Sequence, residues 1–241
     1  MEIEKSMSLI EINDLFDYGF SICQNSDYFK FSIDSVLLAE FVELKKGKSK
    51  VLDLCSGNAP IPLILHKKYG EIDITAIELQ KEIYALAIKS LEINKIDSIK
   101  VLNDDVQNVK SIFKNEKFDV VTCNPPYFKV NNSYINENPI KAIARHELRL
   151  SLDSLIENVS KIIQNQGYFY MVHHTTRLAE VIDTLHKYNF GIKRLVFIHD
   201  DKDTPASLFL VESMFNGKDF VKVLAPVILK ENLTYKNIFK R

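Results

Sequence analysis

The chain has 241 residues, of which 46% are hydrophobic and 26% are charged, and its formal net charge at pH 7 is −1. These values are typical of a globular protein and argue against a disordered chain. The net charge also excludes a histone-like basic field, so any nucleic acid must be held by a local basic patch.

Three features of the sequence indicate where the protein works. No apolar run reaches the 18 residues that a membrane span needs. The N-terminus, MEIEKSMSLIEIND, is acidic and lacks the apolar segment of a signal peptide. The three cysteines form no CxxC pair, which is typical of the reducing cytosol and argues against a zinc ribbon. We therefore expect a cytoplasmic protein that neither enters a membrane nor binds a metal.

Short apolar runs alternate with longer amphipathic stretches along the chain. Residues 34–44 are predicted to form a short amphipathic helix ahead of the first strand. Strands are then predicted at residues 51–54, 72–77, 99–102, 118–123, 168–172, 193–198 and 207–211. Helices are predicted between them at residues 61–65, with an end at Gly70, and at 79–94, 152–163 and 178–188. This alternation predicts parallel βαβ units, a sheet covered by helices on both faces and a closing antiparallel pair.

Residues 51–60, VLDLCSGNAP, lie where the first of these strands passes into a helix. In doubly wound sheets an adenine-containing cofactor binds at such a turn, and a carboxylate at the end of the next strand, here Glu78, accepts hydrogen bonds from the ribose. The turn contains only Gly57, because Cys55 and Ala59 stand where a G-x-G-x-x-G loop carries glycine. A pyrophosphate is therefore not expected, and S-adenosylmethionine, which has no phosphate, suits this turn better.

The tetrapeptide Asn124-Pro125-Pro126-Tyr127 directly follows the predicted strand 118–123. Two consecutive prolines remove two backbone donors and stiffen the chain, so carbonyl oxygens project without competing N–H groups. The Asn124 oxygen beside such a carbonyl offers two acceptors to one exocyclic amino group, and the Tyr127 ring can stack on the planar group that carries it. The tetrapeptide favours methyl transfer to a planar amine or amide nitrogen.

Together with Asp105, these motifs resemble those of class I S-adenosylmethionine-dependent methyltransferases that act on amino nitrogens. The chain is most similar to the bacterial valine tRNA (adenine-N6)-methyltransferase family. Residues 31–39 (FSIDSVLLA) resemble a T-D-x-x-L-L-A stretch of that family, and residues 144–147 (ARHE) resemble its A-R-H-E segment. Residues 206–212 (ASLFLVE) resemble its penultimate strand. The resemblance extends over most of the chain.

This resemblance implies a Rossmann-like α/β fold with a seven-stranded, mostly parallel sheet, one antiparallel strand and helices on both faces. It implies a single methyltransferase domain over residues 1–241, in which residues 1–50 form an extension over the cofactor site and residues 51–241 form the catalytic core. It also implies N6-methylation of an adenosine in tRNA, the one next to the anticodon of valine tRNA. We expect a monomer or a weak dimer whose partner is tRNA.

The resemblance further implies how S-adenosylmethionine is bound. Asp53 anchors the loop and faces the methionyl amino group, Gly57 allows a close backbone approach, Glu78 holds the ribose, and Asp105 accepts from the adenine amine. The expected cofactor-binding residues are Phe31, Asp34, Asp53, Cys55, Gly57, Glu78, Leu79, Asp105, Val106 and Asn124.

The expected catalytic residues are Asn124, Pro125, Pro126 and Tyr127. Asn124 and the Pro125 carbonyl grip the target amine, and Tyr127 stacks on the base. No strong general base is needed, because the sulfonium is a potent methyl donor and positioning supplies most of the barrier reduction. A basic cluster after the tetrapeptide is expected to contact the phosphates of the RNA; its members are Lys141, Arg145 and Arg149.

Other functions are weighed against this one. A protein glutamine N5-methyltransferase acting on release factors is the main alternative, since an amide nitrogen fits the same tetrapeptide. Such enzymes usually carry a longer helical N-terminal domain than the roughly fifty residues found before the first strand here. A DNA adenine methyltransferase needs an additional target-recognition domain. A non-catalytic RNA-binding domain has no use for paired acceptors beside a cofactor turn.

Overall fold

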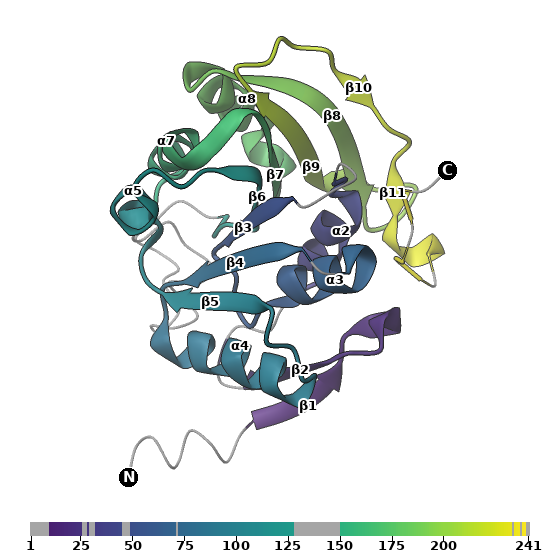
Figure 1. Ribbon diagram of the computed structural model, residues 1–241. Helices are drawn as coiled ribbons and strands as arrows, with labels where there is room; N and C mark the ends of the chain where they lie inside the picture. Colours follow the sequence, from purple (N-terminus) through teal and green to yellow (C-terminus); the bar gives the residue numbers. More distant parts are fainter. Residues whose placement is uncertain are drawn as a thin grey trace, which may run out of the picture.

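The computed structural model describes residues 10–25, 28, 32–44, 49–70, 72–127, 150–232, 234–236 and 238–239. Within these residues, nine strands form one twisted sheet (Figure 1). Seven of them are long: β3 (Lys50–Leu54), β4 (Asp73–Glu78), β5 (Ile99–Asn103), β6 (Phe118–Cys123), β7 (Ile163–His174), β8 (Phe190–His199) and β9 (Ala206–Phe215). Two are of two residues each: β10 (Lys222–Val223) and β11 (Val227–Ile228).

The strand order is β10-β8-β9-β7-β6-β3-β4-β5, and β11 pairs with the end of β8. β9 runs antiparallel to both of its neighbours, β7 and β8, and every other pair in this sheet is parallel. The predicted seven-stranded, mostly parallel sheet with one antiparallel strand is therefore confirmed. The two short strands extend it at the β8 edge, and the sequence analysis predicted neither of them.

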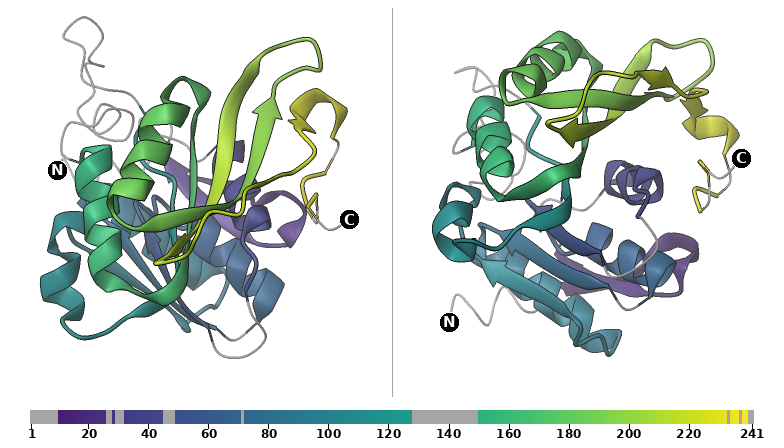
Figure 2. Two further views of the ribbon diagram at one scale, coloured as in Figure 1. Left: turned by 90° about the horizontal axis from the view of Figure 1, so that it is seen from above. Right: turned by 45° about the horizontal axis from the view of Figure 1, so that its top comes forward.

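Helices cover both faces of the sheet, as predicted (Figure 2). One face carries α2 (Ile33–Phe41), α3 (Pro60–Tyr69) and α4 (Lys81–Ile93), and the other carries α5 (Val109–Phe113), α7 (Leu152–Ile162) and α8 (Leu178–Lys187). Successive strand residues alternate between the two cores: Val51 and Val120 pack on the first side, Leu52 and Val121 on the second. Strands buried on both faces read as continuous apolar runs, which is why the sequence reveals them. No helix of the described part is long and apolar enough to cross a membrane.

A hairpin that the sequence did not reveal precedes α2. Its elements are β1 (Ile10–Asp14), η1 (Phe16–Tyr18) and β2 (Ser21–Asn25). The backbone N–H of Cys23 donates to Ser90 Oγ at 2.9 Å, and the side chain of Asn94 bonds to both backbone groups of Ser21 at 2.9 and 2.6 Å. These bonds attach β2 to α4. Asn58 of the cofactor turn donates to the Cys23 carbonyl at 2.8 Å, so the hairpin also supports that turn.

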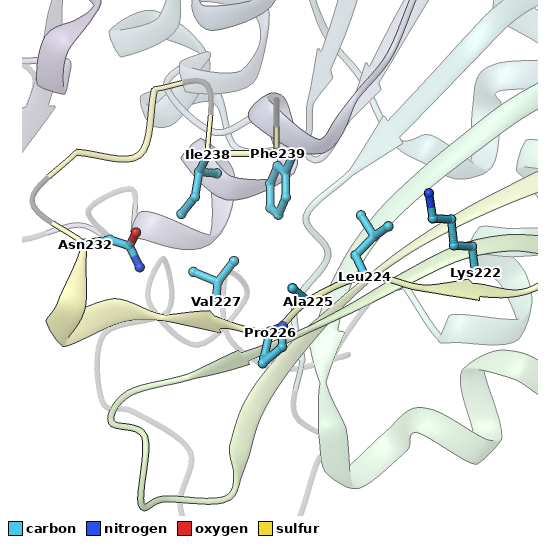
Figure 3. Close-up of a pocket in the computed structure, with 8 residues that line it drawn as sticks. All are labelled: Lys222, Leu224, Ala225, Pro226, Val227, Asn232, Ile238 and Phe239. Atoms are coloured by element: carbon cyan, nitrogen blue, oxygen red, sulfur yellow. The ribbon is translucent and has the colours of Figure 1, made fainter. Parts of the chain in front are cut away.

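Helix α2 differs from its prediction in character. The sequence predicts an amphipathic helix over residues 34–44, but every residue from Ser35 to Phe41 is buried. The C-terminal segment contributes to this burial, since the ring of Phe239 meets that of Phe41 edge-on with centroids 5.5 Å apart. A pocket lies between this segment and β11 (Figure 3), and no predicted active-site residue in the described part of the chain lines it. Its lining residues are Lys222, Leu224, Ala225, Pro226, Val227, Asn232, Ile238 and Phe239.

The C-terminal end of α2 is held by a buried ion pair. Glu40 lies 3.5 Å from the ammonium of Lys68 on α3 and accepts the hydroxyl of Tyr18 at 2.6 Å. The same ammonium donates to the carbonyl oxygens of Ala39 and Glu40 at 2.8 and 2.9 Å. Because the last carbonyls of a helix have no partner within it, Lys68 satisfies groups that burial would otherwise leave unpaired. The pair thus fixes α2 against α3 and η1.

Lys68→Met is expected to lower the free energy of unfolding by about 3–5 kcal/mol, because it leaves the Glu40 carboxylate buried without its cation. In the folded chain the Lys68 and Glu40 side chains are only 9% and 1% exposed. The matched control is Lys50→Met, which breaks an ion pair to Glu116 between side chains that are 33% and 40% exposed; it should cost less than about 1 kcal/mol. Urea unfolding measures both, and equal losses would refute the role given to Lys68.

Candidate active site

The carboxyl ends of four parallel strands meet at one edge of the sheet, and four predicted site residues lie there. Asp53 lies in β3, Glu78 ends β4, Asp105 follows β5 and Asn124 follows β6. β3 pairs in parallel with both β4 and β6, and β4 pairs with β5, so these positions are neighbours in space. This is the edge at which ligands bind in open α/β sheets.

The turn after β3 has an unusual backbone. Cys55, Gly57 and Ala59 all have left-handed conformations, with φ of 56°, 58° and 69°. Residues other than glycine pay about 1–2 kcal/mol in this region. Cys55 and Ala59 thus keep the backbone that glycine would favour at the two positions where the sequence departs from a glycine-rich loop. Backbone strain of this kind clusters at functional sites.

Glu78 shapes this turn. One carboxylate oxygen accepts the backbone N–H of Gly57 and the other accepts that of Gln80, each at 2.9 Å. Burial raises the pKa of Glu78, and these backbone donors counteract part of the rise. Each carboxylate oxygen can accept a second hydrogen bond, so the group can still receive ribose hydroxyls. The carbonyl of the following residue, Leu79, accepts from Asn103 on β5 at 2.9 Å.

Asp53 is completely buried, and only one of its two carboxyl oxygens has a hydrogen-bond partner among the described residues. Its Oδ1 accepts the hydroxyl of Thr122 at 2.6 Å, while its Oδ2 has no hydrogen-bond partner among the described residues. Burial raises the pKa of Asp53 to about 8; the bond from Thr122 opposes this rise and the charge of Glu78 adds to it. A cation placed at Oδ2 would stabilise the carboxylate form.

Three more buried polar atoms at this edge, besides the two ring nitrogens of His173, lack a hydrogen-bond partner within the described part of the chain. They are Ser32 Oγ before α2, Ser56 Oγ in the turn and Gln80 Oε1 after β4. Buried polar groups in folded proteins are normally hydrogen-bonded. The orphaned atoms, together with Asp53 Oδ2, therefore fit a polar ligand that carries an amino group and hydroxyls, as S-adenosylmethionine does.

Asp105 and Val106 begin the next loop. Asp105 caps η2 (Val106–Asn108), with its Oδ1 accepting the backbone N–H of Gln107 at 2.9 Å. Val106 is buried against the core on the α5 side of the sheet. Asp105 is half-buried.

The tetrapeptide is held by side chains from α2. Asn124 Nδ2 donates to Ser35 Oγ at 3.0 Å. The Tyr127 hydroxyl donates to Asp34 Oδ2 at 2.9 Å and also contacts Asn124 Oδ1. Burial, with the nearby Asp34 carboxylate, raises the pKa of Tyr127 well above its usual value. The sequence analysis identified the α2 segment and the tetrapeptide as motifs, but it did not predict that they are in contact.

The far side of Tyr127 is fixed by the end of β7 and by η3 (Thr175–Arg177). The rings of His173 and His174 meet the Tyr127 ring edge-on, with centroids 5.3 and 4.9 Å away. His173 is completely buried, and burial with the charge of Arg177 lowers its pKa to about 4, so it is a neutral ring at pH 7. Arg177 donates to the Tyr127 carbonyl at 3.2 Å and pairs with Glu180 at 2.8 Å.

Four predicted site residues lie outside the described residues. They are Phe31, which was expected to contact the cofactor, and the basic cluster of Lys141, Arg145 and Arg149. The roles given to these four residues stay predictions.

The sheet order, the cofactor edge and the Asn-Pro-Pro-Tyr tetrapeptide after β6 define a class I S-adenosylmethionine-dependent methyltransferase. Its cofactor is S-adenosylmethionine. The model of the methyltransferase small domain family matches residues 28–191, and the chain belongs to this family.

Relatives and solved structures agree with this class. The chain is 30% identical to the tRNA1(Val) (adenine(37)-N6)-methyltransferase of Pseudoalteromonas translucida, over 68% of each chain, and 25% identical to that of Pedobacter heparinus, over 83% of each chain. A predicted O-methyltransferase from Agrobacterium tumefaciens has the same fold, with a TM-score of 0.65, 22% identity and coverage of 81% of this chain and 86% of that one. TYW2 of M. jannaschii, solved with AdoMet, has a TM-score of 0.55, 14% identity and coverage of 86% and 85%.

The raised pKa of Asp53 predicts a pH-dependent stability. The unfolded chain loses this proton near pH 3.9, whereas the folded, ligand-free chain keeps it up to about pH 8. The contribution of Asp53 to the free energy of unfolding is therefore fully present below about pH 4 and is lost as the pH rises to about 8. Urea unfolding from about pH 4 to about pH 8 measures this loss. In the Asp53→Asn variant, the free energy of unfolding should fall less with rising pH than in the wild type. The control Asp119→Asn, an exposed carboxylate at the other end of the sheet, should keep the wild-type slope.

The same group should link cofactor binding to proton release. At pH 7 the ammonium of S-adenosylmethionine would convert Asp53 to its carboxylate, so binding should release up to about one proton. Calorimetry in two buffers of different ionisation enthalpy measures this number. Equal release by wild type and Asp53→Asn would remove Asp53 from the cofactor site.

Proposed function

We propose that this protein transfers the methyl group of S-adenosylmethionine to N6 of the adenosine next to the anticodon of valine tRNA, in the cytoplasm. The observation that carries the proposal is the tetrapeptide at Asn124–Tyr127, held by α2 beside the cofactor edge formed by Asp53 and Glu78. The names of the relatives from Pseudoalteromonas and Pedobacter support the substrate.

The cofactor would be held along the carboxyl edge of the sheet. Asp53 Oδ2 would receive the methionyl ammonium and Glu78 the ribose hydroxyls, while Asp105 would accept from the adenine amine. The other expected contacts come from the turn and its surroundings, at Phe31, Asp34, Cys55, Gly57, Leu79, Val106 and Asn124. When bound, the cofactor supplies a methyl group attached to a sulfonium. Once the methyl group is transferred, the sulfur is left as a neutral thioether.

The target amine would be positioned by the tetrapeptide. Its two N–H groups would donate to Asn124 Oδ1 and to the Pro125 carbonyl, with Pro126 stiffening the chain and Tyr127 stacking on the base. The amine nitrogen uses its lone pair to form the new C–N bond, and the C–S bond breaks. The methylated nitrogen then loses one proton to water. No residue has to act as a strong base, which agrees with the lowered pKa of the nearby His173, whose ring is a weak base.

The substrate is tested by transfer of labelled methyl to an unmodified valine tRNA transcript. The label should appear as N6-methyladenosine at position 37, the position in the relatives' names, and a transcript with guanosine there should accept none. Asn124→Ala should lower the rate about 100-fold, by analogy with the removal of one positioned hydrogen bond in other active sites. Asn158→Ala, a buried asparagine on α7, is the matched control and should keep the wild-type rate. Label in release factor or DNA and none in tRNA would contradict the proposal.

The basic cluster is tested through salt dependence. Arg145→Glu with Arg149→Glu should raise the KM for tRNA and flatten its dependence on salt, by about 0.7–0.9 in the logarithmic slope for each phosphate that the variant no longer binds. The control pair, Lys218→Glu with Lys222→Glu, makes the same charge change on exposed residues at the β10 edge. A slope that changes only in the control pair would place the RNA along the C-terminal segment instead.

A further inference from the structure

The first turn of α2 touches the tetrapeptide at Ser35, a residue to which the sequence assigns no role. Ser35 is buried, 5% exposed, and its Oγ accepts Asn124 Nδ2 at 3.0 Å across 89 positions of the chain. The preceding residue, Asp34, accepts the Tyr127 hydroxyl at 2.9 Å. Two adjacent residues of one helix thus engage the two polar side chains of the tetrapeptide.

The carboxamide of Asn124 needs such a partner because its orientation decides what it can bind. Its oxygen accepts hydrogen bonds and its nitrogen only donates them. The terminal torsion of asparagine is broad and roughly two-fold, so an unheld amide samples orientations in which the oxygen turns away. A target amine that needs an acceptor is gripped only while Oδ1 faces it.

The contacts of Tyr127 leave Asn124 Oδ1 able to accept. The hydroxyl has one proton and lies against two acceptors, Asp34 Oδ2 and Asn124 Oδ1. A bond to a charged acceptor is the stronger, so the proton is drawn toward the Asp34 carboxylate. Asn124 Oδ1 therefore keeps acceptor capacity for an incoming N–H, and the amide nitrogen is occupied by Ser35.

We propose that Ser35 is a positioning residue for methyl transfer, which holds the Asn124 carboxamide with its oxygen turned to the target amine. The proposal rests on the proposed function and adds to it a residue that acts only through Asn124. It makes the N-terminal segment part of the substrate-positioning apparatus, in addition to its expected place over the cofactor.

The test is a double-mutant cycle measured in single-turnover methyl transfer to the tRNA. Ser35→Ala should lower the rate about threefold to tenfold, the effect of removing one hydrogen bond, with unchanged cofactor affinity by calorimetry. In the Asn124→Ala background, Ser35→Ala should have no further effect, because its partner is absent. A merely structural Ser35 would lower the rate by the same factor in both backgrounds, and this outcome would overturn the proposal.

A matched control separates hydroxyl loss from positioning. Ser213 is also a buried serine with one hydrogen bond, to the Phe169 carbonyl at 3.2 Å, and it lies on β9 away from the tetrapeptide. Ser213→Ala should lower stability as Ser35→Ala does, yet keep the wild-type transfer rate. A rate loss equal to that of Ser35→Ala would count against the proposal.

A spectroscopic measurement tests the contact without RNA. The side-chain amide signals of Asn124, assigned with Asn124→Asp, should show one downfield, slowly exchanging proton that Ser35→Ala removes; an unchanged signal would overturn the proposal. A wild-type protein that methylates release factor and not tRNA would contradict the proposed function alone. The cycle would then be run with that substrate, so the two failures are distinguishable.

Discussion

The parallel register of β3, β4, β5 and β6 is the constraint on which the site depends. Parallel strands end at the same edge, so residues that follow different strands meet without any long loop to bring them together. Asp53 and Thr122, 69 positions apart, lie opposite each other in this register and share a 2.6 Å hydrogen bond. The pairing of strands therefore sets the distance between the cofactor turn and the tetrapeptide, and the side chains refine an arrangement that the backbone has already made.

Helix α2 supports the tetrapeptide at this edge. Its C-terminal end is fixed by the buried pair of Glu40 and Lys68, and its first turn reaches the tetrapeptide through Asp34 and Ser35. Every residue of this helix from Ser35 to Phe41 is buried, so the helix has to be covered on every side. The C-terminal segment supplies part of that cover through Phe239. Segments from both ends of the chain thus enclose the helix that orients the reactive residues.

Much of this architecture follows from local patterns in the sequence. The strands are apolar runs because both faces of the sheet are buried. The cofactor turn and the tetrapeptide were recognisable because each follows a strand. Local patterns could not reveal the β1–β2 hairpin, whose outer residues are exposed and whose support comes from Ser90 and Asn94 on a distant helix. Local patterns also predicted the wrong character for α2. The spacing of apolar residues cannot distinguish a helix with one buried face from a helix that is buried on every side. The contact between Asp34 and Tyr127 joins residues 93 positions apart, and no spacing rule contains it.

The electrostatics of the edge decide which part of a substrate can enter. Asp53 and Glu78 are buried carboxyl groups with raised pKa values, and both are better satisfied beside a cationic ligand than beside an anionic one. A phosphate would disfavour the ionised form of both carboxyl groups, whereas a neutral planar base would not. Enzymes that modify a base inside a folded nucleic acid take it out of its stack before reaction. Under the proposed function, the base would therefore enter alone and the tetrapeptide would recognise its uncharged edge. The charged RNA backbone would stay at the rim, where only a local basic patch on this nearly neutral chain can bind it.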